Sequence, residues 1–168
     1  LLGLIVCRNA DPAPAAGFEL RYSRRTGVVM LILFAAMLAL AFVPMHAPLA
    51  SAAAAFYRAG ALVFGGGHVV LPLLHDAVVY PGWVSQADFV AGYGAAQAVP
   101  GPMFSVAAFL GARMAGIDAL AGALVSVVAI MLPGMLLVAA ALPGWHWLAR
   151  HPLAPRAIAG VNAAVVGL

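Results

Sequence analysis

Two stretches of the chain, residues 26–43 and 119–142, contain no charged side chain. They are 18 and 24 residues long, and a helix needs roughly 20 apolar residues to cross the hydrocarbon core of a bilayer. Inside that core every backbone amide must find its partner within the protein, which α-helices achieve along a single segment. The two stretches therefore predict spanning helices and an all-α, polytopic integral membrane protein.

The composition excludes several other classes of protein. Hydrophobic residues make up 65% of the chain and charged residues 8%, whereas a soluble domain has about 45–50% and about 25%. The positive charges are all arginine and are scattered, which argues against a nucleic-acid-binding surface. Cys7 is alone and no Cys/His cluster has the spacing of a zinc site, so we expect no disulfide, no metal site and no cofactor.

Charges beside the spans predict their orientation. Arg21, Arg24 and Arg25 precede the first span, which places that side in the cytoplasm by the positive-inside rule. We expect the second span to begin after Asp118, to kink at Pro133-Gly134 and to end at a loop over residues 143–155. Arg150 and Arg156 should lie in the cytoplasm too, so an even number of crossings must separate them from the first three arginines, whether the intervening segments cross fully or turn back.

The two intervening segments, residues 52–80 and 85–115, each read as a broken helix pair. Gly65, Gly66 and Gly67 interrupt the first, because each glycine costs a helix about 1 kcal/mol. Pro81-Gly82 predicts the turn that ends this segment. Ser85 is a predicted N-cap of the second segment, with Asp88 in the first turn. Pro100, Gly101 and Pro102 interrupt the second segment.

Breaks of this kind predict a binding site. The first free N–H groups of a helix carry the positive end of its dipole, so two helix starts that face one cavity would bind an anion. Arg58, Gln97 and Ser105 flank the breaks and can donate hydrogen bonds to an oxyanion. His68 and Asp76 are candidate proton carriers, because ionisable groups inside a membrane are seldom structural.

Each feature also has a structural interpretation. Glycine triplets serve as close-packing surfaces between membrane helices, and a Pro-Gly-Pro segment can be a simple loop. Arg58 can extend to the outer interface instead of a binding site. His68 and His75 can be hydrogen-bonded structural residues, and Asp76 and Asp88 can be helix-end charges in water.

At these residues the sequence resembles the chromate ion transporter family. The resemblance rests on residues 56–74, 92–102, 109–112 and 160–168, and covers most of residues 52–168. The residues that fall in the family's signature segments are Arg58, Gly65, Gly66, Gly67, Gln97, Pro100, Gly101 and Pro102. His68 stands where many relatives are expected to have an aromatic or small residue.

The resemblance implies chromate efflux through a multi-pass protein of the bacterial inner membrane, driven by proton-motive force and giving chromate resistance. Long members of the family carry two homologous halves, and this chain resembles a second half. Residues 1–7 would then end a preceding transmembrane helix, residues 8–25 would link the halves in the cytoplasm, and residues 26–168 would form a partial half with another helix beginning at 157–168. The expected partners are chromate or a similar oxyanion, protons, the lipid bilayer and the first half.

Three hypotheses follow from the sequence. The first is an oxyanion transporter, for chromate, sulfate or another oxyanion. The second is a membrane scaffold subunit that transports nothing, against which the polar groups at both breaks argue. The third is an intramembrane enzyme, but His68, His75 and Asp76 lack the spacing of His-Glu-x-x-His and no Gly-x-Ser-x-Gly is present.

Overall fold

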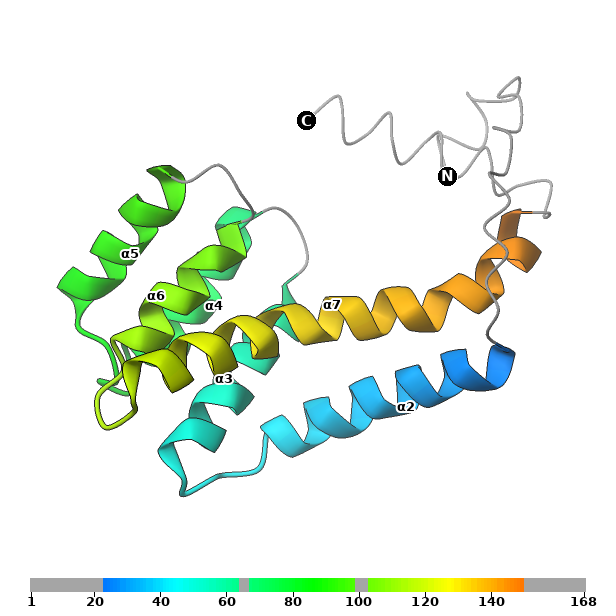
Figure 1. Cartoon of the computed structure of the whole chain (residues 1–168), viewed down its shortest axis with the longest axis horizontal. Coiled ribbons are helices and arrows are strands. Elements are labelled where there is room, and N and C mark those ends of the chain that lie inside the picture. The colour runs from blue at the N-terminus through cyan, green and yellow to red at the C-terminus, as the bar shows by residue number, and fades with distance from the viewer. Residues whose placement is uncertain (1–22, 64–66, 99–102, 150–168) are drawn as a thin grey trace. The chain divides into compact units, whose positions relative to one another are not determined.

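The computed structural model describes residues 23–63, 67–98 and 103–149, and every regular element in these ranges is a helix, as the sequence predicted (Figure 1). The chain forms two compact units, residues 1–30 with 138–168 and residues 31–137. The elements are α2 (Arg24–Ala41), α3 (Pro48–Leu62), α4 (Gly67–Val78), α5 (Gln86–Ala98), the 3₁₀ turn η1 (Met103–Ser105), α6 (Val106–Ala112) and α7 (Ala119–Ala149). The second unit contains α3 to α6 and most of the length of the two long helices, which continue into the first.

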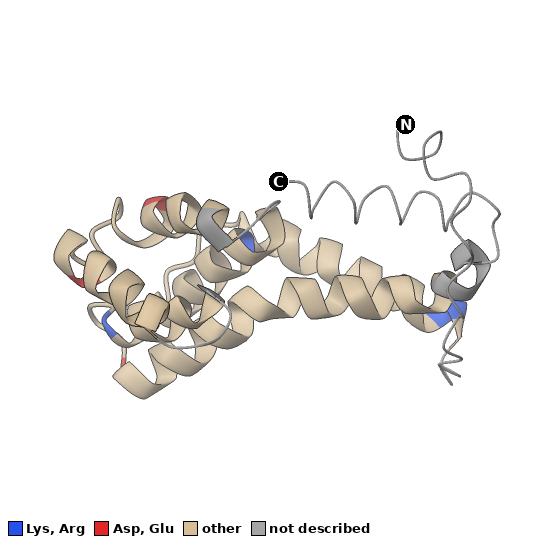
Figure 2. Ribbon diagram, turned by 90° about the horizontal axis from the view of Figure 1, so that it is seen from above, with Lys and Arg blue, Asp and Glu red and all other residues tan. Residues whose placement is uncertain are grey.

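The two predicted spans are the two helices long and apolar enough to cross a membrane, by length and composition, among the described residues: α2 and residues 119–144 of α7. Within the second unit their large apolar side chains are exposed, including Leu31, Ile32 and Leu33 on α2 and Leu124 and Met135 on α7. Charged residues are few along the described ribbon (Figure 2). Exposed apolar faces at this length fit contact with lipid hydrocarbon.

The predicted end of the second span at Leu142 is wrong. Helix α7 continues through Pro143-Gly144 to Ala149, so residues 143–149 are helical and do not form the predicted loop. Proline removes one backbone hydrogen bond, but an apolar helix in a membrane protein tolerates that loss. Helix α3 likewise begins at Pro48, four residues before the predicted start, with the proline in the first turn where its missing N–H costs nothing.

Both predicted helix breaks are confirmed at their described edges. Helix α3 ends at Leu62, Val63 is extended, and α4 begins at Gly67. Helix α5 ends at Ala98, and a new helical segment starts at Met103. The predicted turn at Pro81-Gly82 is also present. Gly82 adopts a φ of 76°, a backbone angle that residues other than glycine rarely adopt.

Two helices approach α7 so closely that only glycine fits. A Cβ atom on Gly60 of α3 would overlap the backbone carbonyl of Ile130, and one on Gly111 of α6 would overlap that of Gly122. Ser126 of α7, which is fully buried, lies at the second crossing. Small residues at helix crossings are the usual means of close packing between membrane helices. These crossings fix α3 and α6 against the first half of α7.

We expect Gly60→Ala and Gly111→Ala each to lower the free energy of unfolding by about 1–3 kcal/mol, because the added methyl group meets backbone that cannot move aside. Thermal unfolding of the purified protein in mild detergent, followed by circular dichroism, measures the effect. Gly94→Ala is the matched control, since a Cβ atom there meets no atom within 4 Å. Equal stability of all three variants would contradict the packing described here.

Candidate functional site

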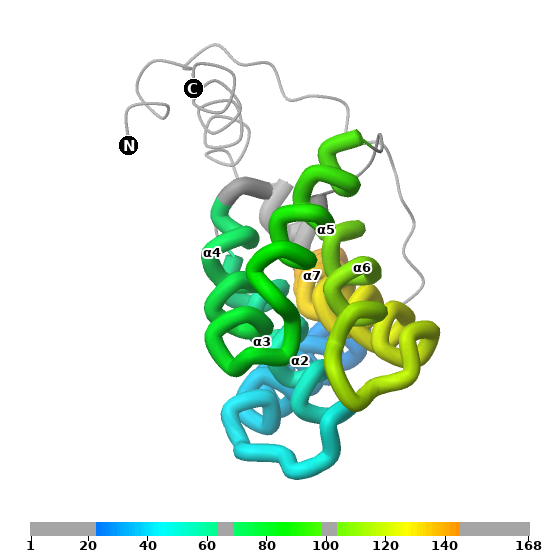
Figure 3. Tube along the Cα trace, turned by 90° about the vertical axis from the view of Figure 1, so that its left-hand side faces the viewer, coloured from blue at the N-terminus to red at the C-terminus, as the bar shows by residue number. Residues whose placement is uncertain are grey.

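Three helix ends gather at one end of a small helical group. Helices α4, α5 and α6 run side by side, and α5 is antiparallel to both (Figures 1 and 3). The end of α5 therefore lies at the same end of the group as the starts of α4 and α6. The 3₁₀ turn η1, which precedes α6, contacts α4, α5 and α6. The described edges of the two breaks are thus neighbours.

The polar side chains described at this end come from α5 and η1. The Gln97 amide nitrogen donates a hydrogen bond to the Tyr93 hydroxyl at 2.8 Å, and both side chains lie on the last turns of α5. Ser105 is exposed and occupies the N-cap position of α6, yet its hydroxyl makes no capping hydrogen bond. Gly67 is the first residue of α4. An amide, two hydroxyls and the helix starts can all donate to an anion.

Several predicted site residues lie outside this description. Gly65 and Gly66 of the first break and Pro100, Gly101 and Pro102 of the second lie outside the described residues, and so does the side chain of His68. Tyr93, in contrast, is a site residue that the sequence analysis missed. Its spacing of four residues from Gln97 is the signal that could have revealed it, because such pairs are neighbours on a helix.

Arg58 lies apart from these groups. One of its guanidinium nitrogens donates a 2.7 Å hydrogen bond to the carbonyl of Ala41, at the end of α2, and the guanidinium lies 5.6 Å from the centre of the Phe42 ring. A cation is favourable at the negative end of a helix dipole. In this arrangement Arg58 binds the end of α2, and its role as an anion ligand stays a prediction.

Asp76 also lies apart from the helix starts. It follows Gly67 by nine residues, about 13 Å along α4 at about 1.5 Å per residue, and its side chain is 82% exposed. His75 is beside it, with Nε2 2.8 Å from the Gln86 side-chain oxygen and its ring edge-on to Phe89. These contacts join the end of α4 to the start of α5, at the opposite end of the group from the breaks. The role of Asp76 in proton coupling stays a prediction.

The same opposite end holds the ion pair between Arg113 and Asp88. Arg113 donates two hydrogen bonds to one Asp88 oxygen, at 2.9 and 2.6 Å, and Ser85 exchanges hydrogen bonds with Asp88 through its hydroxyl, which confirms the predicted N-cap. Asp88 lies in the first turn of α5, outside the spanning helices. The Ser85 hydroxyl and then the Arg113 guanidinium hold the pKa of its carboxyl below the ordinary value.

Comparison with known proteins relates the chain to one family. The sequence model of the chromate transporter family matches residues 50–168. The chain is 32% identical to a probable chromate transport protein of Synechococcus elongatus and 34% identical to a chromate transport protein of Cupriavidus metallidurans, each over 113 residues, or 67% of this chain. It is also 40% identical over 82 residues, 48% of this chain, to the uncharacterized transporter YwrB of Bacillus subtilis.

The matched region is a small part of these relatives. It covers 28% of the Synechococcus protein, 27% of the Cupriavidus protein and 40% of the Bacillus protein. No solved structure matches the chain.

The contacts of Asp88 predict a specific acid sensitivity. Because its pKa is lowered in the folded state, its stabilising effect is complete above the ordinary carboxyl value of 3.8 and disappears as the pH falls through the lower folded value. We expect Asp88→Asn to lose this part of the acid dependence of unfolding and Arg113→Gln to move it to higher pH. Unfolding midpoints measured from pH 5 downward test this, and identical profiles for the variants and the unmodified protein would contradict it.

Proposed function

Since the chain belongs to the chromate transporter family, we propose that it carries part of an oxyanion pathway through the membrane and that chromate is the substrate. The observation that carries this proposal is the meeting of the two helix breaks, where η1 lies against α4 beside the end of α5. In membrane transporters, interrupted helices of this kind form binding sites, because their free backbone groups need a partner inside the protein.

The chemistry of the helix ends suits a tetrahedral oxyanion. Chromate is a dianion that resembles sulfate in shape, and each of its oxygens accepts hydrogen bonds. The free N–H groups at the starts of α4 and of the segment after the second break donate such bonds with the favourable end of the helix dipole. Glycine at the first break, at positions 65–67, lets an anion approach the backbone without a side chain in between.

Gln97 and Ser105 add neutral donors to this site. The Gln97 amide carries two N–H groups, of which one is directed to the Tyr93 hydroxyl, so the other remains to bind an anion. The Ser105 hydroxyl is exposed beside the start of α6. Tyr93 orients Gln97 and makes its amide a better-defined donor. We therefore assign Gln97 and Ser105 to the anion and Tyr93 to the positioning of Gln97.

The remaining parts of the proposal concern energy and partners. Efflux from the cytoplasm driven by the proton-motive force and a location in the bacterial inner membrane are predictions of the family resemblance. Proton coupling through His68 or Asp76 and an anion contact from Arg58 are predictions from the chemistry of residues near the breaks. A second, homologous half completes the pathway, either in the same chain or as a separate subunit. Transport by this route breaks no covalent bond of the substrate, which makes an enzymatic activity unnecessary.

The first test is transport by the full-length protein in inverted membrane vesicles. We expect uptake of radiolabelled chromate that needs a proton gradient and that excess sulfate does not abolish. Vesicles without the protein are the control. Uptake of sulfate in preference to chromate would contradict chromate as the substrate and still support an oxyanion site. Uptake of neither anion above the control would contradict the whole proposal.

A matched pair of glutamines tests the position of the site. Gln97→Ala should lower the rate of chromate uptake about tenfold or more, because a lost hydrogen bond to a charged group costs about 1.5–3 kcal/mol. Gln86→Ala is the control, since Gln86 is an exposed glutamine at the other end of the same helix and contacts His75 instead. Similar rates for both variants at equal expression would place the anion elsewhere.

A further inference from the structure

Two cavities of the second unit adjoin each other, one apolar and one polar. The apolar groove has a volume of about 480 Å³ and lies between α2, α3 and α7. The polar pocket has a volume of about 240 Å³ and lies where α2 ends, beside Arg58 and Trp83. Ala41, Met45 and Ala54 line both cavities. A single elongated molecule can therefore occupy both.

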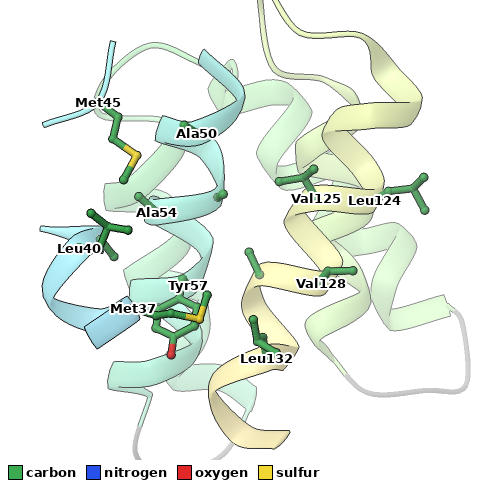
Figure 4. Close-up of a pocket in the computed structure, with 13 residues that line it drawn as sticks. Met37, Leu40, Met45, Ala50, Ala54, Tyr57, Leu124, Val125, Val128 and Leu132 are labelled. Atoms are coloured by element: carbon green, nitrogen blue, oxygen red, sulfur yellow. The ribbon is translucent and has the colours of Figure 1, made fainter. Parts of the chain in front are cut away.

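The groove is almost entirely apolar along its length, and the hydroxyl of Tyr57, which also lines it, donates a hydrogen bond to the carbonyl of Phe34. Met37 and Leu40 of α2, Ala50 and Ala54 of α3, and Leu124 and Val128 of α7 line it (Figure 4). The small side chains of the alanines on α3 keep the groove open, because larger side chains at these positions would fill it. Such a surface favours a hydrocarbon chain and offers nothing to a free inorganic anion.

The pocket at the end of the groove offers one positive charge. Among the described residues that line it, Arg58 is the only charged one, and Ser51 and Trp83 are there as well. Arg58 uses one nitrogen for the carbonyl of Ala41, which leaves the other N–H groups of its guanidinium for a ligand. In the part of the chain that the structure describes, the basic side chains that lie beside a carboxylate are His75, next to Asp76, and Arg113, next to Asp88, and Arg58 is not one of them.

The position of the pocket at the end of α2 also fits a lipid headgroup. Ala41 is the last residue of α2, one of the two helices long enough to cross the membrane, so the pocket opens at the end of a span. Tryptophan and half-buried arginine are typical of that level, where the polar headgroups meet the hydrocarbon.

From this arrangement we propose that the groove and the Arg58 pocket together bind one anionic phospholipid. An acyl chain lies in the groove between α2, α3 and α7, and the phosphate receives hydrogen bonds from Arg58. The described residues of the pocket lining include no carboxylate to hold the ammonium group of a zwitterionic lipid, so a headgroup with net negative charge is preferred. In this proposal Arg58 serves the lipid, and the oxyanion pathway uses the donors at the helix breaks.

Native mass spectrometry of the full-length protein in mild detergent tests the proposal. After removal of bound lipid, phosphatidylglycerol and phosphatidylcholine with identical acyl chains are added in separate titrations. We expect one phosphatidylglycerol to bind with at least about tenfold higher affinity than phosphatidylcholine. Equal binding of the two lipids, or displacement of phosphatidylglycerol by inorganic phosphate at the same concentration, would overturn the proposal.

Two variants test the two parts of the site separately. Arg58→Gln should remove the preference for phosphatidylglycerol, with Arg113→Gln as the control because Arg113 is paired with Asp88. Ala53→Leu should weaken the binding of both lipids by filling the groove without touching Arg58, with Ala95→Leu on the exposed face of α5 as the control. Unchanged lipid binding by folded Ala53→Leu would overturn the proposal. A crosslink showing that another helix of the protein, and not a lipid, occupies the groove would overturn it too.

Discussion

The second unit depends on direct contact between the backbones of neighbouring helices, which α3 and α6 each make with the first half of α7. Helices in hydrocarbon gain little from burying apolar side chains against one another, so close van der Waals packing has to hold them together. Gly60 brings α3 onto Ile130, and Gly111 brings α6 onto Gly122. Because α4 follows α3 and α6 follows the second break, these two crossings also determine where the two interrupted segments resume. The packing that holds the unit together therefore also positions its candidate site.

Much of this architecture could be predicted from the sequence, because the strongest signals are local. Uncharged runs predicted α2 and most of α7, and the glycine and proline clusters predicted both breaks to within a few residues. The end of α7 was not predictable in this way. A Pro-Gly pair such as Pro143-Gly144 ends most helices in water. The residues that follow it, Trp145, His146 and Trp147, are compatible with a continued helix. In a membrane, unpaired backbone groups cost more free energy than a proline within a helix, which favours continuation.

The site was predicted less completely, because contacts between distant segments leave no local pattern. Gln97 and Ser105 lie at the described helix ends since they adjoin the second break directly. Arg58 also adjoins a break in sequence, but its side chain turns to a carbonyl seventeen residues earlier in the chain. Asp76 was selected as an ionisable group in a predicted membrane segment, an argument that leaves out its distance along the helix from the break. Both residues show that the sequence can tell which helix carries a side chain. It does not tell which groups that side chain contacts.

The separation of Arg58 from the helix breaks is consistent with what a transport site requires. A pathway must bind its ion strongly enough to strip its water and weakly enough to release it on the other side. A buried guanidinium would hold a dianion in every conformation, whereas donors divided between α5, η1 and the start of α4 act together only while these segments face one another. A small relative movement of the segments would then disperse the donors and release the anion. On this argument the neutral donors Gln97 and Ser105 suit the moving substrate, and the fixed charge of Arg58 suits a ligand that stays.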